Sequence, residues 1–399
     1  EPTYKSVLSK MFLGRFPIML FSDLCILKNM APDVRFEMGE CKNEHGGYFI
    51  VDGKEKVIVS QEKFADNMLY VRDKLNDLYS HSADIRSVSE DASKPIRTLS
   101  VRILSPSAKY TNNQIVVVLP NVRKPVPLFI VMRALGVLSD KSIIEHCLLD
   151  LDKSGSYVDL FIPCVPDSGM IFSRDQALKY IATFTKHKTV PHALEILTNY
   201  FLPHVGEMNF TAKAYYLGHM VRELLRVFTK DTTPTDRDNF RFKRVELPGD
   251  LLYDLFNEHL NLQQKSIYQK IDKEYTYKKG IYKDNFIGLI EQNYRDIFAD
   301  RIIETGFRKG FKGNWGSEES TKRLGVVQTL NRLSYNSALS HLRKINLPLD
   351  ASAKVVGPRR LHSSQWGMID PFDTPDGGNI GLHKHMAIAA VITTNCSGK

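Results

Sequence analysis

The sequence has no long apolar segment and few cysteines. No stretch approaches the roughly 18 uninterrupted apolar residues of a membrane helix, so we expect no membrane-spanning segment. The cysteines include no CxxC pair, and a zinc site built from them alone is therefore not expected. An odd, scattered set is typical of buried thiols in a reducing compartment. The set consists of Cys25, Cys41, Cys147, Cys164 and Cys396.

The sequence also lacks an initiator methionine, internal repeats and low-complexity tracts. Its N-terminal residues show no small-residue cleavage site after their apolar part, so we expect a cut edge and not a signal peptide. The C-terminal residues TTNCSGK follow directly on an apolar strand and lead to the same expectation. With 43% hydrophobic and 25% charged residues, the composition is that of a globular protein. The length of 399 residues predicts two or three domains.

Turn signals and hydrophobic periodicity predict a mixed α+β chain in which helices predominate, without an alternating βαβ pattern. Asp52-Gly53 lies between two β-rich runs and predicts a hairpin within Gly46–Ser60, because this pair readily adopts the positive φ angles of a type I′ turn. Ser80–Pro95 is polar, ends in proline and is interpreted as a linker. Further strands are predicted at Thr98–Leu104, Gln114–Leu119 and Leu128–Met132.

Apolar residues at three- and four-residue spacing predict amphipathic helices in much of the remaining chain. Leu251–Ile271 and Asp284–Thr305 are expected to be long helices. Gly306–Gly316 contains four glycines and is predicted to be a break. Shorter helices are predicted at Lys141–Leu151, Arg174–Lys186, Ala193–Leu202, Ala212–Phe228 and Asn336–Ile345.

Positive charge is concentrated in the last quarter of the chain. The formal net charge is +9, and Arg301–Lys399 contains 14 Lys and Arg against 7 Asp and Glu. A solvated basic face explains such an excess, and so does contact with a polyanion such as a phosphate backbone. Charge alone does not decide between these interpretations.

Two pairs of carboxylates invite a metal-binding or catalytic interpretation. Asp236 and Asp238 form a DxD sequence, but no third hard ligand lies at a telling distance and basic residues follow closely. Local ion pairing in a turn is therefore the preferred explanation. Asp373 and Asp376 could form a general acid–base pair. Because the proline and glycine of their DTPDG sequence suit a turn, an acid that caps its own turn is preferred.

Histidine, glycine and basic residues near the C-terminus also have competing interpretations. His383 and His385 would face one side of a strand, but without a third ligand nearby two surface or half-buried histidines are preferred over a metal site. Gly377–Gly381 lacks the Lys-Ser/Thr of a P-loop and the strand before a dinucleotide-binding turn, so nucleotide binding is not predicted. Cations at the C-terminal end of a helix interact favourably with the helix dipole, which is a structural role. Exposed arginines on a stiff loop instead suit phosphate contact. The residues concerned are Arg343 and Lys344 for the helix end, and Lys354, Arg359 and Arg360 for the loop.

Pro358–Ala390 reads PRRLHSSQWGMIDPFDTPDGGNIGLHKHMAIAA and combines an arginine pair, a Trp-Gly step and a TPDG turn. It resembles the fork region of the second-largest subunit of multisubunit DNA-dependent RNA polymerases, which commonly reads P-x-ETPEG-x-x-x-GL. Other blocks resemble the same subunit in family order and mark its RNA polymerase II-like branch. They are FPIMLFSDLCILK (Phe16–Lys28) and GGYFIVDGKEKVIVSQEK (Gly46–Lys63) for the protrusion, PLFIVMRALGVLSDKSIIEH (Pro127–His146) for the lobe, TDRDNFRFKRVELPGDLL (Thr235–Leu252) for the return to the protrusion, and GNWG (Gly313–Gly316) with VVQTLNRLSYNSALSHLRKINLP (Val326–Pro348) for the fork.

This resemblance implies a protrusion (residues 1–95 and 245–312), a lobe (96–244) and a fork (313–399). It also implies one wall of the active-centre cleft of a template-directed nucleotidyltransferase, which holds downstream DNA and the RNA–DNA hybrid. Gln328 matches a fork glutamine that contacts the hybrid backbone, and residues 350–356 match fork loop 2 beside the transcription bubble. Arg343, Lys344 and Arg359 match basic residues of the family, and Asp376 matches the second acid of ETPEG. With the loop cations Lys354 and Arg360 they are the expected nucleic-acid contacts, and Asp373, Asp376 and Gly377 are expected near the active centre.

The resemblance implies partners and cofactors as well. The expected partners are the largest polymerase subunit, the smaller subunits, template DNA and the RNA–DNA hybrid. Mg²⁺ is expected in the largest subunit and Zn²⁺ only beyond residue 399, so the chain alone is expected not to be catalytic. The divergent DTPDG and the shortened loop after Trp315 suggest a member from a large DNA virus. The expected location is the nucleus for a cellular source, and the virion or a cytoplasmic virus factory for a viral one.

Some residues depart from the family pattern, and two other functions stay open. Both glutamates of ETPEG are aspartates here, Gly378 stands where glutamine is common, and Glu318-Glu319 occupy a loop that is often basic. An interaction module of a basic nuclear or virion protein, without a nucleic-acid role, is the second hypothesis. A self-contained enzyme that uses Asp373 and Asp376 is the least favoured one.

Overall fold

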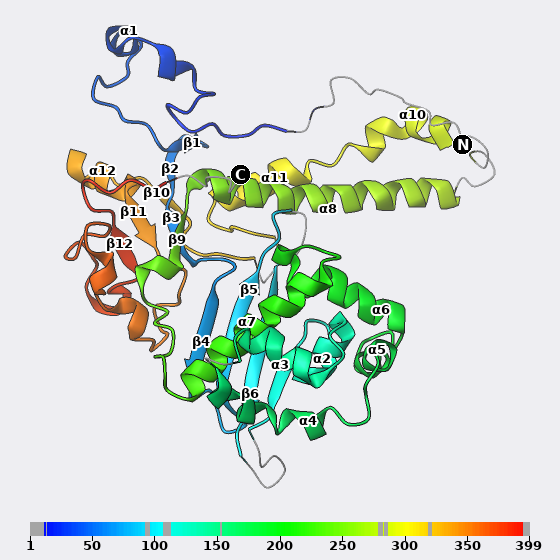
Figure 1. Cartoon of the computed structure of the whole chain (residues 1–399). Coiled ribbons are helices and arrows are strands. Elements are labelled where there is room, and N and C mark those ends of the chain that lie inside the picture. The colour runs from blue at the N-terminus through cyan, green and yellow to red at the C-terminus, as the bar shows by residue number, and fades with distance from the viewer. Residues whose placement is uncertain are drawn as a thin grey trace. The chain divides into compact units, whose positions relative to one another are not determined.

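The computed structural model describes residues 12, 14–91, 96–106, 113–151, 154–277, 282, 286–317 and 321–393. The chain divides into two compact units, a first unit of residues 1–64 and 238–399 and a second unit of residues 65–237 (Figure 1). Helices and three mostly antiparallel sheets confirm the predicted mixed α+β class. The second unit begins before the expected start of the lobe at residue 96.

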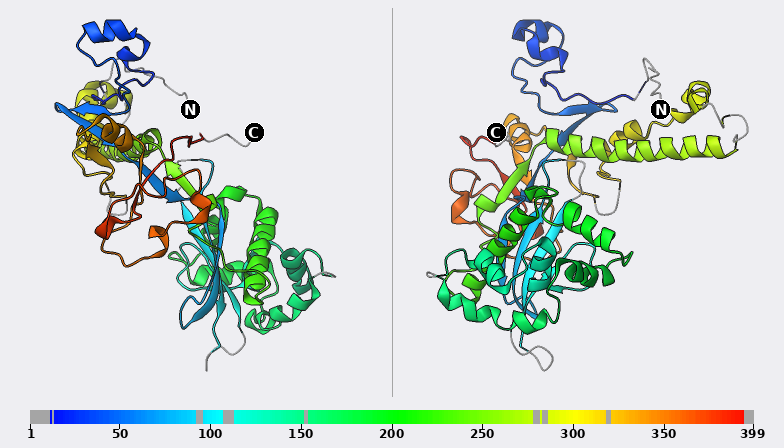
Figure 2. Two further views of the ribbon diagram at one scale, coloured as in Figure 1. Left: turned by 90° about the vertical axis from the view of Figure 1, so that its left-hand side faces the viewer. Right: turned by 45° about the vertical axis from the view of Figure 1, so that its right-hand side comes forward.

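The second unit is built on a five-stranded antiparallel sheet. Its strand order is β4 (Leu69–Asp73), β5 (Tyr79–Ser87), β6 (Arg97–Leu104), β7 (Ile115–Val118) and β8 (Val126–Pro127). Its helices are α2 (Leu128–Leu135), α3 (Asp140–Leu148), α4 (Cys164–Asp167), α5 (Arg174–Thr183), α6 (Val190–Glu195) and α7 (Phe210–Phe228). The helices gather on one side of the sheet, where α7 packs across β4, β5 and β6 (Figure 2). The strands predicted at β6 and β7 and the helices predicted at α3, α5 and α7 are confirmed.

Two sequence predictions fail in the second unit. Leu128–Met132 is not a strand but the start of α2, whose residues are all buried. A short apolar run does not distinguish a buried helix from a buried strand, which explains this error. The first half of the predicted linker Ser80–Pro95 is a strand. Its residues up to Ser87 belong to β5, which buries Ala83 and Ile85. Residues 92–95 lie outside the described residues.

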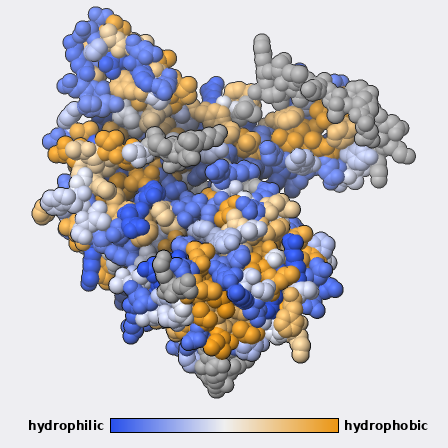
Figure 3. Space-filling model, in the orientation of Figure 1, coloured by the Kyte–Doolittle hydropathy of each residue, from blue (hydrophilic) through white to orange (hydrophobic). Residues whose placement is uncertain are grey.

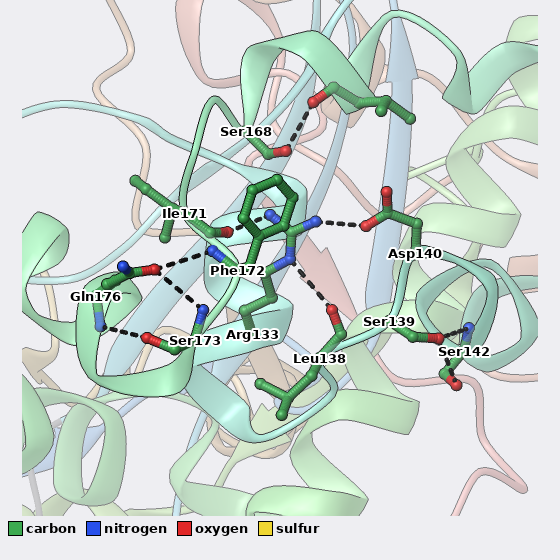
Figure 4. Close-up of polar contacts among 11 residues, drawn as sticks. Arg133, Leu138, Ser139, Asp140, Ser142, Ser168, Ile171, Phe172, Ser173 and Gln176 are labelled. Atoms are coloured by element: carbon green, nitrogen blue, oxygen red, sulfur yellow. Dashed lines mark hydrogen bonds and ion pairs between the residues drawn. The ribbon is translucent and has the colours of Figure 1, made fainter.

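Arg133 on α2 is a buried cation that connects three segments of the second unit (Figure 4). Its guanidinium donates to the backbone carbonyls of Leu138 and Ile171 and pairs with Asp140 of α3. The ring of Phe172 lies 5.2 Å from the guanidinium carbon. A buried guanidinium needs partners for its donors. The network therefore fixes the loop before α5 against α2 and α3.

Apolar side chains are exposed on the same part of the second unit. Figure 3 shows hydrophobic surface over the region of α3 and α4. Contiguous apolar surface is typical of protein interaction sites. Between residues 138 and 172, the exposed large apolar side chains are Leu138, Leu149, Ile162, Val165, Met170 and Phe172.

The first unit contains two smaller sheets. A three-stranded antiparallel sheet has the order β1 (Phe49–Val51), β2 (Lys54–Ile58) and β10 (Val327–Thr329), and a four-stranded sheet has the order β12 (His383–His385), β11 (Lys344–Asn346), β3 (Ser60–Phe64) and β9 (Lys243–Glu246). Asp52 and Gly53 connect β1 to β2 with φ angles of 49° and 73°, which confirms the predicted hairpin. Both sheets thus pair strands from the two sequence segments of this unit.

Helices of different length complete the first unit. They are α1 (Pro32–Glu37), α8 (Pro248–Tyr277), α10 (Phe286–Ile297), α11 (Ile302–Phe311) and α12 (Tyr335–Leu342). Helices α8 and α11 share a hydrophobic core with β1 and β2. Helices α10 and α11 pack along α8 (Figure 1). The helices predicted at α8 and α12 are confirmed. Shorter helical turns complete the chain: η1 (Ile26–Asn29), η2 (Gly155–Phe161), η3 (Ile196–Tyr200, a π-helix), η4 (Pro203–Val205), η5 (Phe240–Phe242), η6 (Gly357–Arg359), η7 (Ser363–Gln365) and η8 (Gly377–Asn379).

The predictions around α10 and α11 need correction. Asp284–Thr305 is not one helix, because α10 ends at Ile297 and α11 begins at Ile302. The predicted break starts too early, since α11 continues through Gly306 and Gly310. A Cβ at Gly306 would lie 2.2 Å from the Nε2 atom of His259 on α8. The glycine therefore serves the close approach of two helices and does not end one.

Candidate nucleic-acid interface

The four-stranded sheet contains three of the sequence-predicted residues, Lys344, His383 and His385. In the antiparallel register of β11 and β12, Lys344 lies opposite His385 and Asn346 lies opposite His383. Because side chains alternate along a strand, these four share one face of the sheet. Ile345 and its neighbour on β12 project to the other face. As predicted, His383 and His385 face the same side, and both are half-buried.

Glu62 of β3 is a buried carboxylate between two buried lysines. Lys384 Nζ lies 2.6 Å from its Oε2 atom, and Lys243 Nζ lies 3.2 Å from its Oε1 atom. The three residues are only 1%, 7% and 6% exposed, in the order Glu62, Lys384 and Lys243. The ring centroid of Phe64 lies 3.8 Å from Lys243 Nζ and helps to balance the excess positive charge. This triad joins β12, β3 and β9, which is a structural use of basic residues.

Sequence reasoning did not single out Lys384. Alternation along β12 places it on the face opposite His383 and His385, and that signal was available in the sequence. Its partner Glu62 lies 322 positions away, so no local pattern reveals the ion pair. The buried contact between the Asn346 amide and Gln61, at 3.1 Å, was missed for the same reason.

Gln328 lies half-buried on β10 and its amide has defined partners. Its Nε2 atom donates to the carbonyl of Gly325 at 3.0 Å. Its Oε1 atom lies 3.0 Å from Nε2 of His341 on α12. The N-terminus of α12 is fixed by a capping box between Ser334 and Ser337. Gln328 is therefore held by the backbone of Gly325, which precedes β10, and by the His341 side chain of α12.

Arg343 and Lys344 follow α12 and differ in how they are held. Arg343 Nη2 donates to the backbone carbonyls of Ala387 at 2.7 Å and Ile388 at 3.3 Å. Lys344 is half-buried, and this burial lowers its pKa, whereas the nearby carboxylate of Asp373 acts in the opposite direction. Within the described residues neither cation forms an ion pair within 4.0 Å. Both therefore carry positive charge without a carboxylate within ion-pair distance, although Asp373 acts on Lys344 from farther away.

Arg359 connects the loop of residues 350–356 to the glycine-rich segment of residues 377–381 by hydrogen bonds. Gly381 has a φ of +72°, and a Cβ there would lie 2.3 Å from the Arg359 carbonyl oxygen, so only glycine permits this approach. The guanidinium forms its hydrogen bonds with backbone carbonyls of this chain. It donates to the carbonyls of Gly378 (2.6 Å), Ile380 (3.2 Å), Ala351 (2.9 Å) and Ala353 (3.3 Å).

Lys354 and Arg360 are the exposed cations of this region. Lys354 belongs to the loop that Arg359 fastens, and Arg360 follows η6 directly. In the part of the chain that the structure describes, neither side chain has an ion-pair or hydrogen-bond partner. They differ in this respect from the buried lysines of the Glu62 triad.

The DTPDG turn is capped by other residues than predicted. Asp370 Oδ1 accepts hydrogen bonds from the backbone N–H groups of Phe372 and Asp373. Thr374 Oγ1 accepts from the N–H of Gly381 and donates to the carbonyl of His383, each at 2.9 Å. A hydroxyl can do both, whereas a carboxylate only accepts, which explains why threonine fills this position. The interpretation of an acid that caps its own turn is therefore wrong.

The two aspartates of the turn have different surroundings. Asp373 Oδ1 lies 3.1 Å from Nδ1 of His385, and Ser340 Oγ lies 3.4 Å from Asp373 Oδ2. Asp376 is exposed and precedes η8 without capping it. Gly377 has a φ of +67°, in the left-handed region. This arrangement ties one carboxylate to β12 and leaves the other in solvent.

The remaining candidates do not form a metal centre. Within the described residues, no three His, Cys, Asp or Glu side chains are grouped to hold a metal ion. Asp238 Oδ2 instead lies against Gly357, where an added Cβ would come within 2.4 Å. No helix among the described residues is both long enough and apolar enough to cross a membrane. The predictions for Glu318-Glu319 and for Cys396 concern residues outside the described ranges.

Comparison with known families decides which class of protein this sheet and loop belong to. A family model described as RNA polymerase beta subunit matches residues 3–289, more than half of the chain. The chain belongs to this family. A second model, described as RNA polymerase Rpb2, domain 3, matches residues 328–392. All of the nucleic-acid candidates, from Gln328 to Arg360, and the DTPDG turn lie within that second match.

Curated relatives in the family cover nearly the whole chain. DNA-directed RNA polymerase II subunit RPB2 of Schizosaccharomyces pombe is 34% identical over 96% of this chain and 32% of its own length. The protein of the same name from Encephalitozoon cuniculi is 37% identical over 98% of this chain and 34% of its own length. DNA-directed RNA polymerase subunit Rpo2 of Saccharolobus shibatae is 31% identical over 98% and 33%. The chain thus spans about a third of the length of these family members.

Proposed function

We propose that the chain is part of the second-largest subunit of a DNA-dependent RNA polymerase. In this role it forms one wall of the active-centre cleft and contacts downstream DNA and the RNA–DNA hybrid. The observation that carries the proposal is a pair of exposed cations, Lys354 within the loop that the Arg359 guanidinium orders and Arg360 directly after η6. Phosphate oxygens are the natural partners of exposed cations on an ordered surface.

The order of this loop supports the proposal. A loop that is held before binding loses less conformational entropy when it meets its partner. Four N–H···O=C contacts from Arg359 supply such order without using carboxylates, so the surface stays positive. We therefore assign Arg359 mainly to ordering the loop, and Lys354 and Arg360 to phosphate contact.

The other candidates take supporting positions in this proposal. Arg343, bonded to a backbone carbonyl, and Lys344, near Asp373, add positive charge. Gln328 presents an amide to the hybrid backbone. Asp376 and Gly377 lie near the active centre. Since such contacts go to phosphate and sugar, binding is expected to be independent of base sequence.

In this proposal, other parts of the enzyme supply metal binding and phosphoryl transfer. The largest subunit holds Mg²⁺ and performs phosphoryl transfer, the smaller subunits complete the assembly, and any Zn²⁺ is bound beyond residue 399. We propose a protrusion, a lobe and a fork with the borders given above. The proposed location is the nucleus for a cellular source, and a virion or virus factory for a viral one.

Salt dependence of binding tests the proposal. A fluorescently labelled RNA–DNA hybrid is titrated with the chain at several salt concentrations, and a DNA duplex of the same length serves as a second probe. Because phosphate contacts release counterions, affinity is expected to fall steeply and linearly on a logarithmic salt scale. The same affinity at low and high salt, or no binding at low salt, would contradict the nucleic-acid role and favour an interaction module.

A further inference from the structure

His341 connects the Gln328 amide to the turn that precedes α12. Its Nδ1 atom lies 3.1 Å from the backbone N–H of Asn331, and its Nε2 atom lies 3.0 Å from Gln328 Oε1. The Asn331 side chain in turn accepts hydrogen bonds from Leu333 N–H and Ser337 Oγ. The imidazole is thus bonded on both nitrogens, between β10 and the start of the helix that carries it.

These contacts allow one protonation state. A backbone N–H can only donate, so Nδ1 must be the unprotonated acceptor. Nε2 then carries the proton and donates it to Gln328 Oε1. The amide orientation follows, because its Nε2 atom donates to the Gly325 carbonyl. Each of these contacts pairs one donor with one acceptor, so the neutral histidine and the glutamine fix one another.

The charged surroundings favour the same neutral form. Burial lowers the pKa of His341, and the positive charges of Lys344 on β11 and His385 on β12 lower it further. Asp373 is engaged with His385 and also lies near Lys344. A second proton on His341 would have to enter Nδ1, where it would face the N–H of Asn331. Geometry and charge therefore both oppose protonation.

We propose that His341 is a positioning residue that presents the amide of Gln328 to the nucleic-acid backbone. This inference rests on the proposed function, in which Gln328 contacts the hybrid. The amide nitrogen has two N–H groups, and the Gly325 carbonyl takes one. The second N–H suits a phosphate or sugar oxygen. His341 acts on binding only through this amide, because its own two nitrogens are already occupied.

A double-mutant cycle tests the inference in the full 399-residue chain, with the labelled RNA–DNA hybrid as the probe. The variants are His341→Leu, His341→Gln, Gln328→Leu and the combination of His341→Leu with Gln328→Leu. Leucine removes the donor to Gln328, whereas glutamine keeps an amide N–H near the position of the imidazole Nε2. Thermal unfolding of each variant checks that it is folded, and histidine-selective NMR reports the tautomer of His341.

The expected result has three parts. His341→Leu weakens hybrid binding about three- to ten-fold, the range that one hydrogen bond supplies. His341→Gln restores most of the affinity, which a purely packing role would not do. In the Gln328→Leu background, His341→Leu causes no further loss. NMR is expected to find the proton on Nε2 at neutral pH.

A matched control separates positioning from loosening of the helix. His45 contacts Tyr335 on α12 but not Gln328, so His45→Leu is expected to leave binding within about two-fold, less than one hydrogen bond supplies. If His341→Leu weakens binding equally with and without Gln328, or has no effect while the native chain binds, the inference is wrong and the proposed function stands. If the native chain itself does not bind the hybrid, the proposed function is wrong and the inference falls with it.

Discussion

The first unit uses basic side chains in two contrasting ways. Lys243 and Lys384 are buried and both contact Glu62, whereas Lys354 and Arg360 are exposed and have no such partner among the described residues. All four lie within the segments that return to the first unit after the second. The contrast is thus one of burial and pairing, not of position along the chain.

This contrast shows what a count of charges misses. A buried ammonium group must be paired, because its desolvation is not otherwise compensated. An exposed cation has no such requirement and stays available to a polyanion. The excess of 14 basic over 7 acidic residues in Arg301–Lys399 includes both kinds. Lys384 contributes to that excess and yet serves the fold.

The largest effect is expected when the buried triad is broken. Glu62→Gln leaves two lysines buried without a carboxylate, and removal of one partner from a buried pair typically destabilises by about 3–5 kcal/mol. The free energy of unfolding, measured by urea denaturation with circular dichroism, is expected to fall by that order.

An exposed ion pair provides the control for the triad. Lys42 and Asp33 lie 3.1 Å apart at the surface, and exposed pairs contribute about 0–1 kcal/mol. Asp33→Asn is therefore expected to change the unfolding free energy by less than about 1 kcal/mol. A similar loss in Asp33→Asn and Glu62→Gln would mean that burial does not distinguish the two kinds of basic residue.

An intermediate effect is expected for Arg359, which belongs to neither group. Arg359→Ala removes four contacts to backbone carbonyls, and carbonyls left without a donor cost about 1–3 kcal/mol where they are buried. Because the region is partly exposed, we expect about 1 kcal/mol of lost stability. Faster amide hydrogen exchange at residues 350–356 is expected as well. Unchanged exchange there would show that the guanidinium does not order the loop.

Local signals in the sequence predicted part of this architecture. The Asp52-Gly53 hairpin and the helix α12 were predictable because their determinants lie within a few residues. The apolar run of α2 and the glycines of α11 led to wrong predictions. The burial of α2 on all sides and the close packing of α11 both depend on partners distant in the sequence. For the site, the sequence correctly predicted the exposure of Lys354 and Arg360, but Arg359 beside the same loop is half-buried and bonded to backbone carbonyls. The contact of Glu62 with Lys384 was not, because it joins positions 322 apart.

A smaller effect on stability is expected from pH. Burial lowers the pKa values of His259, His341 and His383 in the first unit from 6.5. Below pH 6.5 the unfolded chain therefore binds more protons than the folded chain. The contribution of these histidines to stability should be fully present above their ordinary pKa of 6.5. It should be lost as the pH falls through their lowered pKa values in the folded chain. Urea denaturation at pH 7.5 and pH 5.5 measures this difference.

Removal of one of these groups checks the cause of the pH effect. His383 is half-buried, and the nearby charges of Lys344 and His385 also lower its pKa. His383→Asn is expected to reduce the loss of stability between pH 7.5 and pH 5.5, because one proton acceptor disappears from the unfolded state. An identical pH dependence in the native chain and the variant would contradict this assignment.

The smallest effect on stability, and a clear effect on binding, is expected for the exposed cations. Lys354→Ala and Arg360→Ala should each change the unfolding free energy by less than about 0.5 kcal/mol. Each should also lower the slope of log affinity against log salt for the RNA–DNA hybrid by about 1, since one phosphate contact is lost. The double variant Lys179→Ala/Lys186→Ala removes two exposed lysines of the second unit and controls for net charge. If that control lowers the slope as much as the Lys354 and Arg360 variants together, long-range charge and not local contact explains the binding. In that case exposure alone would not separate the loop cations from the rest of the basic surface.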